Sequence, residues 1–291
     1  MGAQRTGWTF GQRPGDAFRR SGKRRINPND AESAFGSDTQ QVAMAEYDFN
    51  APRLFVDAPL QAGARIALDR GQANYLLNVL RLRAGDPVLV FNGRDGEWRA
   101  EVSVEGRKAA DLVCTERTRE QGAAADLVYA FAPLKHARLD YMVQKAVEMG
   151  AGVLQPVLTR RTQASRVNLE RMRSNAIEAA EQCGILSIPD IREEESLERF
   201  LKGLDKERQI VFCDEDAPVA NPVDALAKLG NNRSGLVVIV GPEGGFTDQE
   251  RALVAAHERC VRVSLGPRIL RADTAAVAAL AIVQSVLGDW R

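Results

Sequence analysis

The hydrophobic pattern of the chain changes its period along the sequence, and each period predicts a different structure. From residue 126 to residue 291, short apolar runs rich in β-branched residues alternate with longer segments of helical spacing. The run LVVIV at residues 236–240 is apolar throughout, which is typical of a strand covered on both faces of a parallel sheet. Strands and helices that alternate in this way predict a doubly wound α/β domain over residues 126–291.

The same pattern gives the individual elements of this domain. Helices are expected at residues 141–150, 169–184, 222–229, 249–258 and 274–288, and strands at residues 127–134, 153–158, 208–215, 236–240 and 261–265. The helix at residues 169–184 should pack on the sheet through Met172, Ile177 and Ala180. The last helix is apolar nearly all round, so we expect it to be buried in its own core or against a partner subunit.

Residues 51–122 follow a shorter period, with alternating runs separated by turn residues. The segment at residues 73–82 has helical spacing that puts Leu76, Val79 and Leu80 on one side. A small β-barrel with one helix would remove the exposed strand edges. Residues 1–50 lack a sustained apolar period, so we expect a disordered extension, and Met44 is a possible start of the natural chain.

Composition narrows the classes of function. The chain has 39 Lys plus Arg and 39 Asp plus Glu, so RNA contact would have to come from local basic patches rather than from an overall field. The four cysteines are scattered without a CxxC pair, which favours reduced thiols in the cytoplasm and argues against zinc or a disulfide framework. No metal ligand set and no apolar run of membrane-spanning length is present in the sequence.

Two glycine loops follow predicted strands and carry the candidate chemistry. Residues 241–245 follow one strand, and Thr247 and Glu250 then form a capping box at the start of a helix, a typical ligand site at the carboxyl end of a sheet. The loop lacks the P-loop lysine and the GxGxxG fingerprint, and Glu243 would repel phosphate, so a neutral or cationic ligand fits better. A second loop follows the strand at residues 261–265. From spacing alone, two ordinary turns remain an equal alternative.

The sequences of both loops resemble a known signature. VGPEGGFTDQE at residues 240–250 and SLGPRILRADTAAVAAL at residues 264–280 are similar to the paired motifs of the RsmE family of SPOUT methyltransferases. The resemblance implies a trefoil-knotted parallel-sheet domain preceded by a PUA-like RNA-binding β-barrel at residues 51–122. It also implies a homodimer that uses S-adenosylmethionine to methylate N3 of uridine 1498 in the 16S rRNA of the small ribosomal subunit.

The resemblance also assigns roles to residues. Arg271 is the first candidate to stabilise the uridine anion and Arg161 the second, while Asp273 would orient the base or accept its proton. Asp273 has the alternative role of capping the last helix, for which Thr274 competes. The predicted RNA contacts are Arg81, Arg83, Arg160, Arg161 and Arg166, with Trp98 and Tyr75 as stacking platforms. The predicted cofactor-binding residues are Val240, Gly241, Pro242, Glu243, Gly244, Gly245, Leu265, Gly266, Ile269, Leu270 and Thr274.

Two other functions remain open at this stage. A SPOUT enzyme could act on another RNA or on a ribose 2′-hydroxyl, or the chain could be a non-catalytic RNA-binding factor in ribosome assembly. Asn74, Ile185 and Asp273 depart from the family pattern, in which a histidine, an arginine and a glutamate are usual. Cofactor binding with turnover separates an enzyme from an assembly factor.

Overall fold

The computed structural model describes residues 51–105, 109–135, 137–164, 166–217, 221–230 and 235–290. All of them belong to one compact unit at residues 46–291. The disordered extension predicted for residues 1–50 lies outside the described residues. Among the helices that the structure describes, none is long and apolar enough to cross a membrane.

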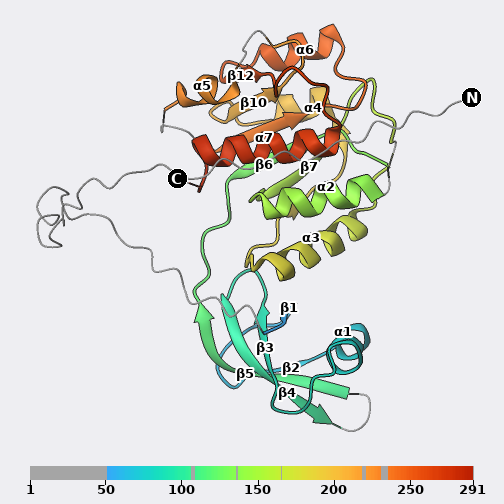
Figure 1. Cartoon of the computed structure of the whole chain (residues 1–291), viewed down its shortest axis with the longest axis vertical. Coiled ribbons are helices and arrows are strands. Elements are labelled where there is room, and N and C mark those ends of the chain that lie inside the picture. The colour runs from blue at the N-terminus through green and yellow to red at the C-terminus, as the bar shows by residue number, and fades with distance from the viewer. Residues whose placement is uncertain are drawn as a thin grey trace, which may run out of the picture. The chain divides into compact units, whose positions relative to one another are not determined.

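A five-stranded sheet forms the first part of the described chain, as predicted. Its order is β1-β3-β4-β5-β2, with β1 parallel to β3 and the other pairs antiparallel, so β1 and β2 stand at the two edges of a curled half-barrel (Figure 1). Leu54, Val88, Val90 and Leu112 fill its core. The strands are β1 (Arg53–Phe55), β2 (Arg65–Ala67), β3 (Pro87–Phe91), β4 (Glu97–Glu105) and β5 (Ala109–Arg119).

The helix of this sheet departs from the predicted pattern. Helix α1 (Arg70–Asn74) continues into a π-helical turn, η2 (Tyr75–Val79), in which the Leu80 amide donates to the Tyr75 carbonyl at 2.9 Å. The helical spacing predicted Leu76, Val79 and Leu80 on one side, but Leu76 is fully buried while Val79 is 61% exposed and Leu80 36% exposed. The reason is the wider i→i+5 turn, which rotates the later residues away from the core.

A buried charge cluster ties the edge strand β1 to β4 and β5. The Glu97 carboxylate accepts from Arg53 Nε at 3.1 Å, from Arg119 Nη2 at 2.9 Å and from the Thr118 hydroxyl at 2.9 Å. Burial opposes ionisation, but the bonds from Arg119 and Thr118 and the charge of Arg53 outweigh it, and the pKa of Glu97 lies below its usual value.

Replacing Glu97 with glutamine is expected to lower the free energy of unfolding by roughly 3–5 kcal/mol at neutral pH, because the mostly buried Arg53 and the partly buried Arg119 lose their counter-charge. Since the folded pKa is depressed, the wild-type contribution is present above the unfolded pKa of about 4.3 and is lost as pH falls through the folded pKa. Urea titrations at several pH values test both statements. Glu116→Gln, on an exposed carboxylate of β5, is the control and should change stability by about 0.5 kcal/mol or less. An equal loss in both variants would contradict the prediction.

The second sheet is parallel throughout and has the order β12-β10-β11-β6-β7-β8, with β9 also paired to β7. This confirms the predicted α/β domain. Its strands are β6 (Leu127–Phe131), β7 (Val153–Leu158), β8 (Asp190–Ile191), β9 (Glu195–Ser196), β10 (Gln209–Cys213), β11 (Leu236–Val240) and β12 (Cys260–Val263). Strand β12 ends at Val263, two residues earlier than predicted, so Ser264 and Leu265 belong to the following loop.

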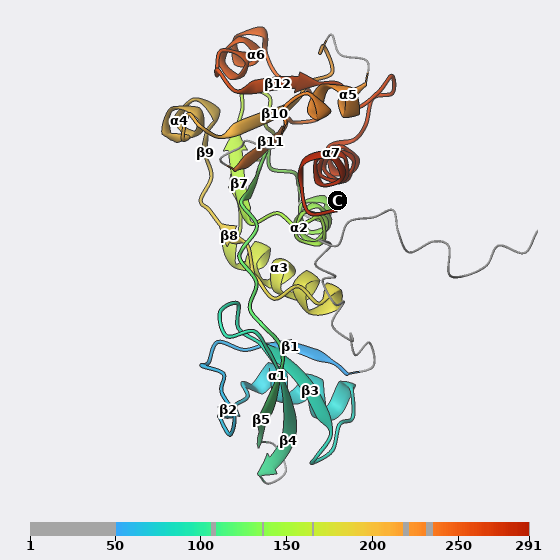
Figure 2. The ribbon, with the colours of Figure 1, turned by 90° about the vertical axis from the view of Figure 1, so that its left-hand side faces the viewer.

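The side chains of the fully apolar central strands pack into two hydrophobic cores, one on each face of the sheet. Leu127, Tyr129 and Phe131 of β6 point into one core, and Val128 and Ala130 point into the other, as the two-residue period of a strand requires. Figure 2 shows α2 and α7 on one face of the sheet and α4 and α6 on the other. The helices are α2 (Ala137–Glu148), α3 (Leu169–Cys183), α4 (Leu197–Gly203), α5 (Pro222–Ala227), α6 (Asp248–Ala255) and α7 (Ala272–Leu287).

Two helices test the predicted burial patterns. Helix α7 is buried along its length through alanines together with Leu280, Val283 and Leu287, as expected. Helix α3 packs on α2 and buries Met172 and Ala180, but Ile177 is only partly buried and the inner positions are taken by Ala176 and Ala179. The trefoil knot and the homodimer remain predictions.

Candidate active site

A cavity of about 780 Å³ lies at the carboxyl ends of β10, β11 and β12. Because β10 stands between β11 and β12 in the sheet, the loops that follow all three strands meet at this edge. Every residue predicted to bind the cofactor lines this cavity except Thr274. Those that do are Val240, Gly241, Pro242, Glu243, Gly244, Gly245, Leu265, Gly266, Ile269 and Leu270.

The loop after β11 has a tight turn that explains its glycines. The Gly245 amide donates to the Pro242 carbonyl at 2.9 Å, and Gly245 has a φ of 68°, which favours glycine. A Cβ on Gly241 would lie 2.4 Å from the ring of Phe246. That ring is 1% exposed and packs edge-on against Phe212. The backbone at Gly241 therefore lies closer to the Phe246 ring than a residue with a Cβ atom could.

The helix after this loop begins with the predicted capping box. The Thr247 hydroxyl accepts from the Glu250 amide at 3.3 Å, and the Glu250 carboxylate accepts from the Thr247 amide at 2.8 Å. Glu250 also accepts from the Arg160 amide at 2.7 Å. Burial raises the pKa of Glu250, but these amide bonds outweigh burial and hold the pKa below its usual value. Glu250 thus joins the loop after β7 to the start of α6.

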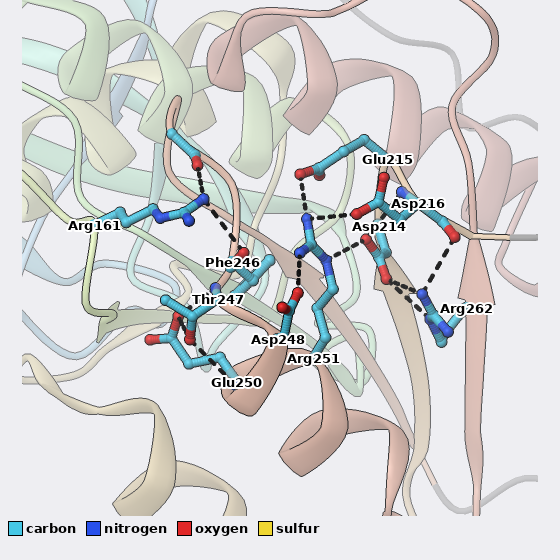
Figure 3. Close-up of polar contacts among 11 residues, drawn as sticks. Arg161, Asp214, Glu215, Asp216, Phe246, Thr247, Asp248, Glu250, Arg251 and Arg262 are labelled. Atoms are coloured by element: carbon cyan, nitrogen blue, oxygen red, sulfur yellow. Dashed lines mark hydrogen bonds and ion pairs between the residues drawn. The ribbon is translucent and has the colours of Figure 1, made fainter.

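Two arginines from outside the glycine loop bind it, one from the loop after β7 and one from helix α2. Arg161 Nη1 donates to the Gly244 carbonyl at 2.7 Å and to the Phe246 carbonyl at 3.5 Å (Figure 3). Arg138, in the first turn of α2, forms an ion pair with Glu243. Arg161 was predicted to contact the target base or the RNA, and the structure places its guanidinium on the loop that lines the cavity.

Sequence reasoning missed the third wall of the cavity, which follows β10. Cys213, Asp214, Glu215 and Ala217 line it. The strand that ends at Cys213 was predicted, but its position between β11 and β12 depends on strand order, which a local pattern does not show. Burial and the nearby Asp214 raise the pKa of the Cys213 thiol to about 12, so the thiol is neutral at physiological pH and is no nucleophile.

The acidic residues of this wall form a network with two arginines. The buried Asp214 accepts from Arg251 Nε at 3.1 Å and from Arg262 Nη2 at 2.6 Å, and Arg251 also binds Glu215, Asp216 and Asp248 (Figure 3). The carboxylates of residues 214–216 lie within 4.8 Å of one another. Arginines occupy the oxygens that a metal ion would need, so the cluster is a structural ion-pair network.

The candidate catalytic residues lie beside the cavity at the start of α7. Arg271 is exposed and is the N-cap residue, without a side-chain cap bond. The alternative role of Asp273 or Thr274 as the cap of this helix is contradicted by the position of Arg271. Helical bonding begins earlier, since the Ala275 amide donates to the Arg271 carbonyl at 2.8 Å, and both residues fall within the first turn. Their neighbours Leu270, Ala272 and Ala275 line the cavity.

The predicted RNA contacts fall into two groups. Arg81 and Arg83 are exposed after the π-helical turn, and Arg81 has a φ of 60°, a conformation rarely adopted by a residue with a side chain. Arg160, Arg161 and Arg166 are exposed in the loop after β7. Two residues are less suited to stacking than predicted: Tyr75 and Trp98 pack against the half-barrel core, and Trp98 Nε1 donates to the Asp95 carbonyl at 2.9 Å.

The lining of the cavity combines ion-paired acidic side chains with an apolar wall. Its charged side chains are Asp214, Glu215 and Glu243, each of which is ion-paired to an arginine outside the lining, and one cation, Arg268. Leu265, Leu270 and Ala275 supply apolar wall. A Cβ on Gly266 would meet no atom within 4 Å, so the chain leaves open space there.

Comparisons with known proteins agree with this geometry. Residues 121–284 match the RNA methyltransferase domain family and residues 68–113 match the RNA methyltransferase PUA domain family. The chain is 31% identical over 233 residues to ribosomal RNA small subunit methyltransferase E of Rickettsia conorii, covering 80% of this chain and 94% of that protein. It is 33% identical over 227 residues to the enzyme of the same name from Synechocystis, covering 77% and 74%.

Solved structures show the same fold. The Neisseria gonorrhoeae ribosomal RNA small subunit methyltransferase E bound to S-adenosyl methionine superposes with a TM-score of 0.74 at 27% identity, covering 83% of this chain and all of that one. A Legionella pneumophila protein with the same cofactor gives 0.70 at 26% identity, covering 81% and 97%. With its predicted glycine loops closing one cavity and its two domains matched in order, the chain belongs to the ribosomal RNA small subunit methyltransferase E family, an RNA methyltransferase family of the SPOUT type.

Proposed function

We propose that the protein transfers the methyl group of S-adenosylmethionine to N3 of uridine 1498 in the 16S rRNA of the small ribosomal subunit. The observation that carries the proposal is the 780 Å³ cavity, in which both signature loops meet around an acidic and partly apolar space. Relatives of the same family, solved with this cofactor, support it. The domain boundaries that we propose are residues 51–122 for the PUA-like domain and 126–291 for the methyltransferase domain.

The residues of the cavity would bind and orient the cofactor, which supplies an electrophilic methyl group on a sulfonium when bound. The glycine loop exposes backbone amides and carbonyls to the ligand without Cβ atoms in the way. Glu215 and Glu243 would offer carboxylate oxygens to the ligand, with Arg251 and Arg138 offsetting their charge. Leu265, Leu270 and Ala275 exclude water from the apolar part, which strengthens each electrostatic contact.

The acceptor nitrogen needs to lose its imide proton before it can attack. Arg271 would stand beside the uridine carbonyl oxygens and stabilise the developing anion with an opposite charge. Asp273 would accept the proton or orient the base: its Oδ1 accepts from the Thr274 amide at 2.8 Å, and its Oδ2 makes no hydrogen bond with a described residue. Both side chains start from the turn that follows cavity residue Leu270.

We propose Arg161 as a positioning residue for the glycine loop. Arg161→Ala should weaken S-adenosylmethionine binding about 10-fold to 100-fold, because the Gly244 and Phe246 carbonyls lose a charged donor worth about 1.5–3 kcal/mol. Calorimetric titration with the cofactor measures this effect. The matched control is Arg160→Ala, since Arg160 bonds Glu250 through its backbone amide, and this variant should keep wild-type affinity. Unchanged cofactor affinity in Arg161→Ala would refute the positioning role.

The activity is tested by incubating the protein with labelled S-adenosylmethionine and small ribosomal subunits that lack the modification. N3 methylation blocks Watson–Crick pairing, so reverse transcription should stop at one uridine, position 1498. Incorporation without a stop would indicate a ribose or another position. Absence of incorporation, with the protein still bound to subunits, would favour an assembly factor.

A further inference from the structure

A second cavity lies at the same edge of the parallel sheet, between the loops after β6 and β7. Its volume is about 470 Å³, within the usual range of ligand pockets. Leu134 and Lys135 line it from the loop after β6, and Gln163, Ala164 and Arg166 from the loop after β7. Strand β6 is the neighbour of β11, so this cavity adjoins the part of the sheet edge that carries the glycine loop.

The second cavity carries a net positive charge. Arg171 donates from Nε and Nη2 to the Asp140 carboxylate at 2.8 and 2.7 Å, and Asn175 donates to it at 2.8 Å, so the one acidic side chain of the lining is neutralised. Lys135 and Arg166 are exposed, and no ion pair or hydrogen bond joins their side chains to another described residue. Two cations of the lining are therefore left without a counter-charge among the described residues.

The side chains of the lining select the class of ligand. Asn168 Oδ1 accepts from the Arg171 amide at 3.0 Å, so the start of α3 is already capped and the positive charge comes from Lys135 and Arg166. Such cations bind phosphate oxygens. Leu134, Leu139 and Met172 add an apolar part that would contact a sugar or base rather than a free inorganic ion.

We infer that this second cavity binds a phosphate of the RNA substrate through Lys135 and Arg166, with Arg171 held beside them by Asp140. The inference deepens the proposed function and rests on it. Arg138 follows the loop after β6 and binds Glu243 of the glycine loop. Arg161 lies in the loop after β7 and binds Gly244 of the same glycine loop. An RNA strand bound at Lys135 and Arg166 would therefore lie beside the glycine loop that lines the proposed cofactor cavity.

The test is the salt dependence of binding to small ribosomal subunits that lack the modification. For the full-length double variant Lys135→Gln/Arg166→Gln, the slope of log Kobs against log salt should be less steep by about 1.4, or 0.7 per lost phosphate contact on single-stranded RNA. Affinity at about 0.1 M salt should fall roughly tenfold. S-adenosylmethionine affinity and the melting temperature should stay at wild-type values.

The matched control is Arg173→Gln/Lys202→Gln, which removes two exposed cations that do not line the cavity. The control should keep the wild-type slope. An unchanged slope in the Lys135/Arg166 variant, or an equal change in the control, would overturn the inference. Because the slope is measured by binding alone, its result is separate from a failure of the proposed function, which would appear as absent methylation by the wild-type protein.

Discussion

Replacing Asp214 with asparagine is expected to cost roughly 3–5 kcal/mol of folding free energy, among the largest effects of any single polar change in this chain. The Asp214 side chain is fully buried and is the common partner of Arg251 and Arg262. An amide of the same size keeps the packing but removes the negative charge and presents an N–H group to one of the guanidinium donors. Two arginines would then remain close together without the carboxylate between them.

Urea denaturation of wild type and Asp214→Asn measures this loss, and the control lies two residues away. Asp216 binds the same arginine at 3.0 Å, but its side chain is 64% exposed. Asp216→Asn should change stability by about 1 kcal/mol or less, because water replaces an exposed partner at little cost. Similar losses in both variants would show that burial of the Asp214 carboxylate does not determine how much the network contributes to stability. Because Asp214 lines the cavity proposed to bind the cofactor, its variant should also bind S-adenosylmethionine more weakly.

The glycine loop shows what the sequence can predict about this site. An apolar β-branched run, glycines and a T-x-x-E box are local signals, and strand β11, the turn and the capping box of Thr247 and Glu250 were all found where those signals stand. The position of Glu243 in the cavity lining was also predictable, since Glu243 is part of the motif. Local chemistry was sufficient wherever one short segment determines its own conformation.

Features that depend on tertiary arrangement were not predictable. Asp214 lies in the site because β10 stands between β11 and β12 in the sheet. Strand order cannot be derived from the spacing of residues along the chain. The π-helical turn places Val79 outside the half-barrel core. The sequence pattern did not predict this, because it was interpreted with a helical period of 3.6 residues. At the start of α7, Asp273 and Thr274 both have capping chemistry, but the helix begins earlier with Arg271 as its N-cap residue.

Arg271→Ala is expected to lower kcat by about 100-fold to 1,000-fold while leaving S-adenosylmethionine affinity near wild type. Arg271 does not line the cofactor cavity, and no hydrogen bond or ion pair fixes its side chain to another described residue, so its guanidinium is available to the uridine. Stabilisation of an anion that develops in the reaction affects the transition state more than the ground state. The loss should therefore appear in kcat and not in cofactor binding.

Single-turnover methylation of unmodified small subunits, followed across pH, separates this role from simple RNA binding. In Arg271→Ala the residual rate should rise more steeply toward alkaline pH than in wild type, because hydroxide then forms the anion that the guanidinium would have stabilised. Arg271→Lys should recover part of the rate, since it restores the charge without the planar fork. Arg268→Ala, which removes a cavity-lining cation of the same loop, should alter cofactor affinity more than kcat. If Arg271→Ala keeps the wild-type rate and pH profile, Arg271 does not stabilise the anion, and the start of α7 serves only to shape the cavity.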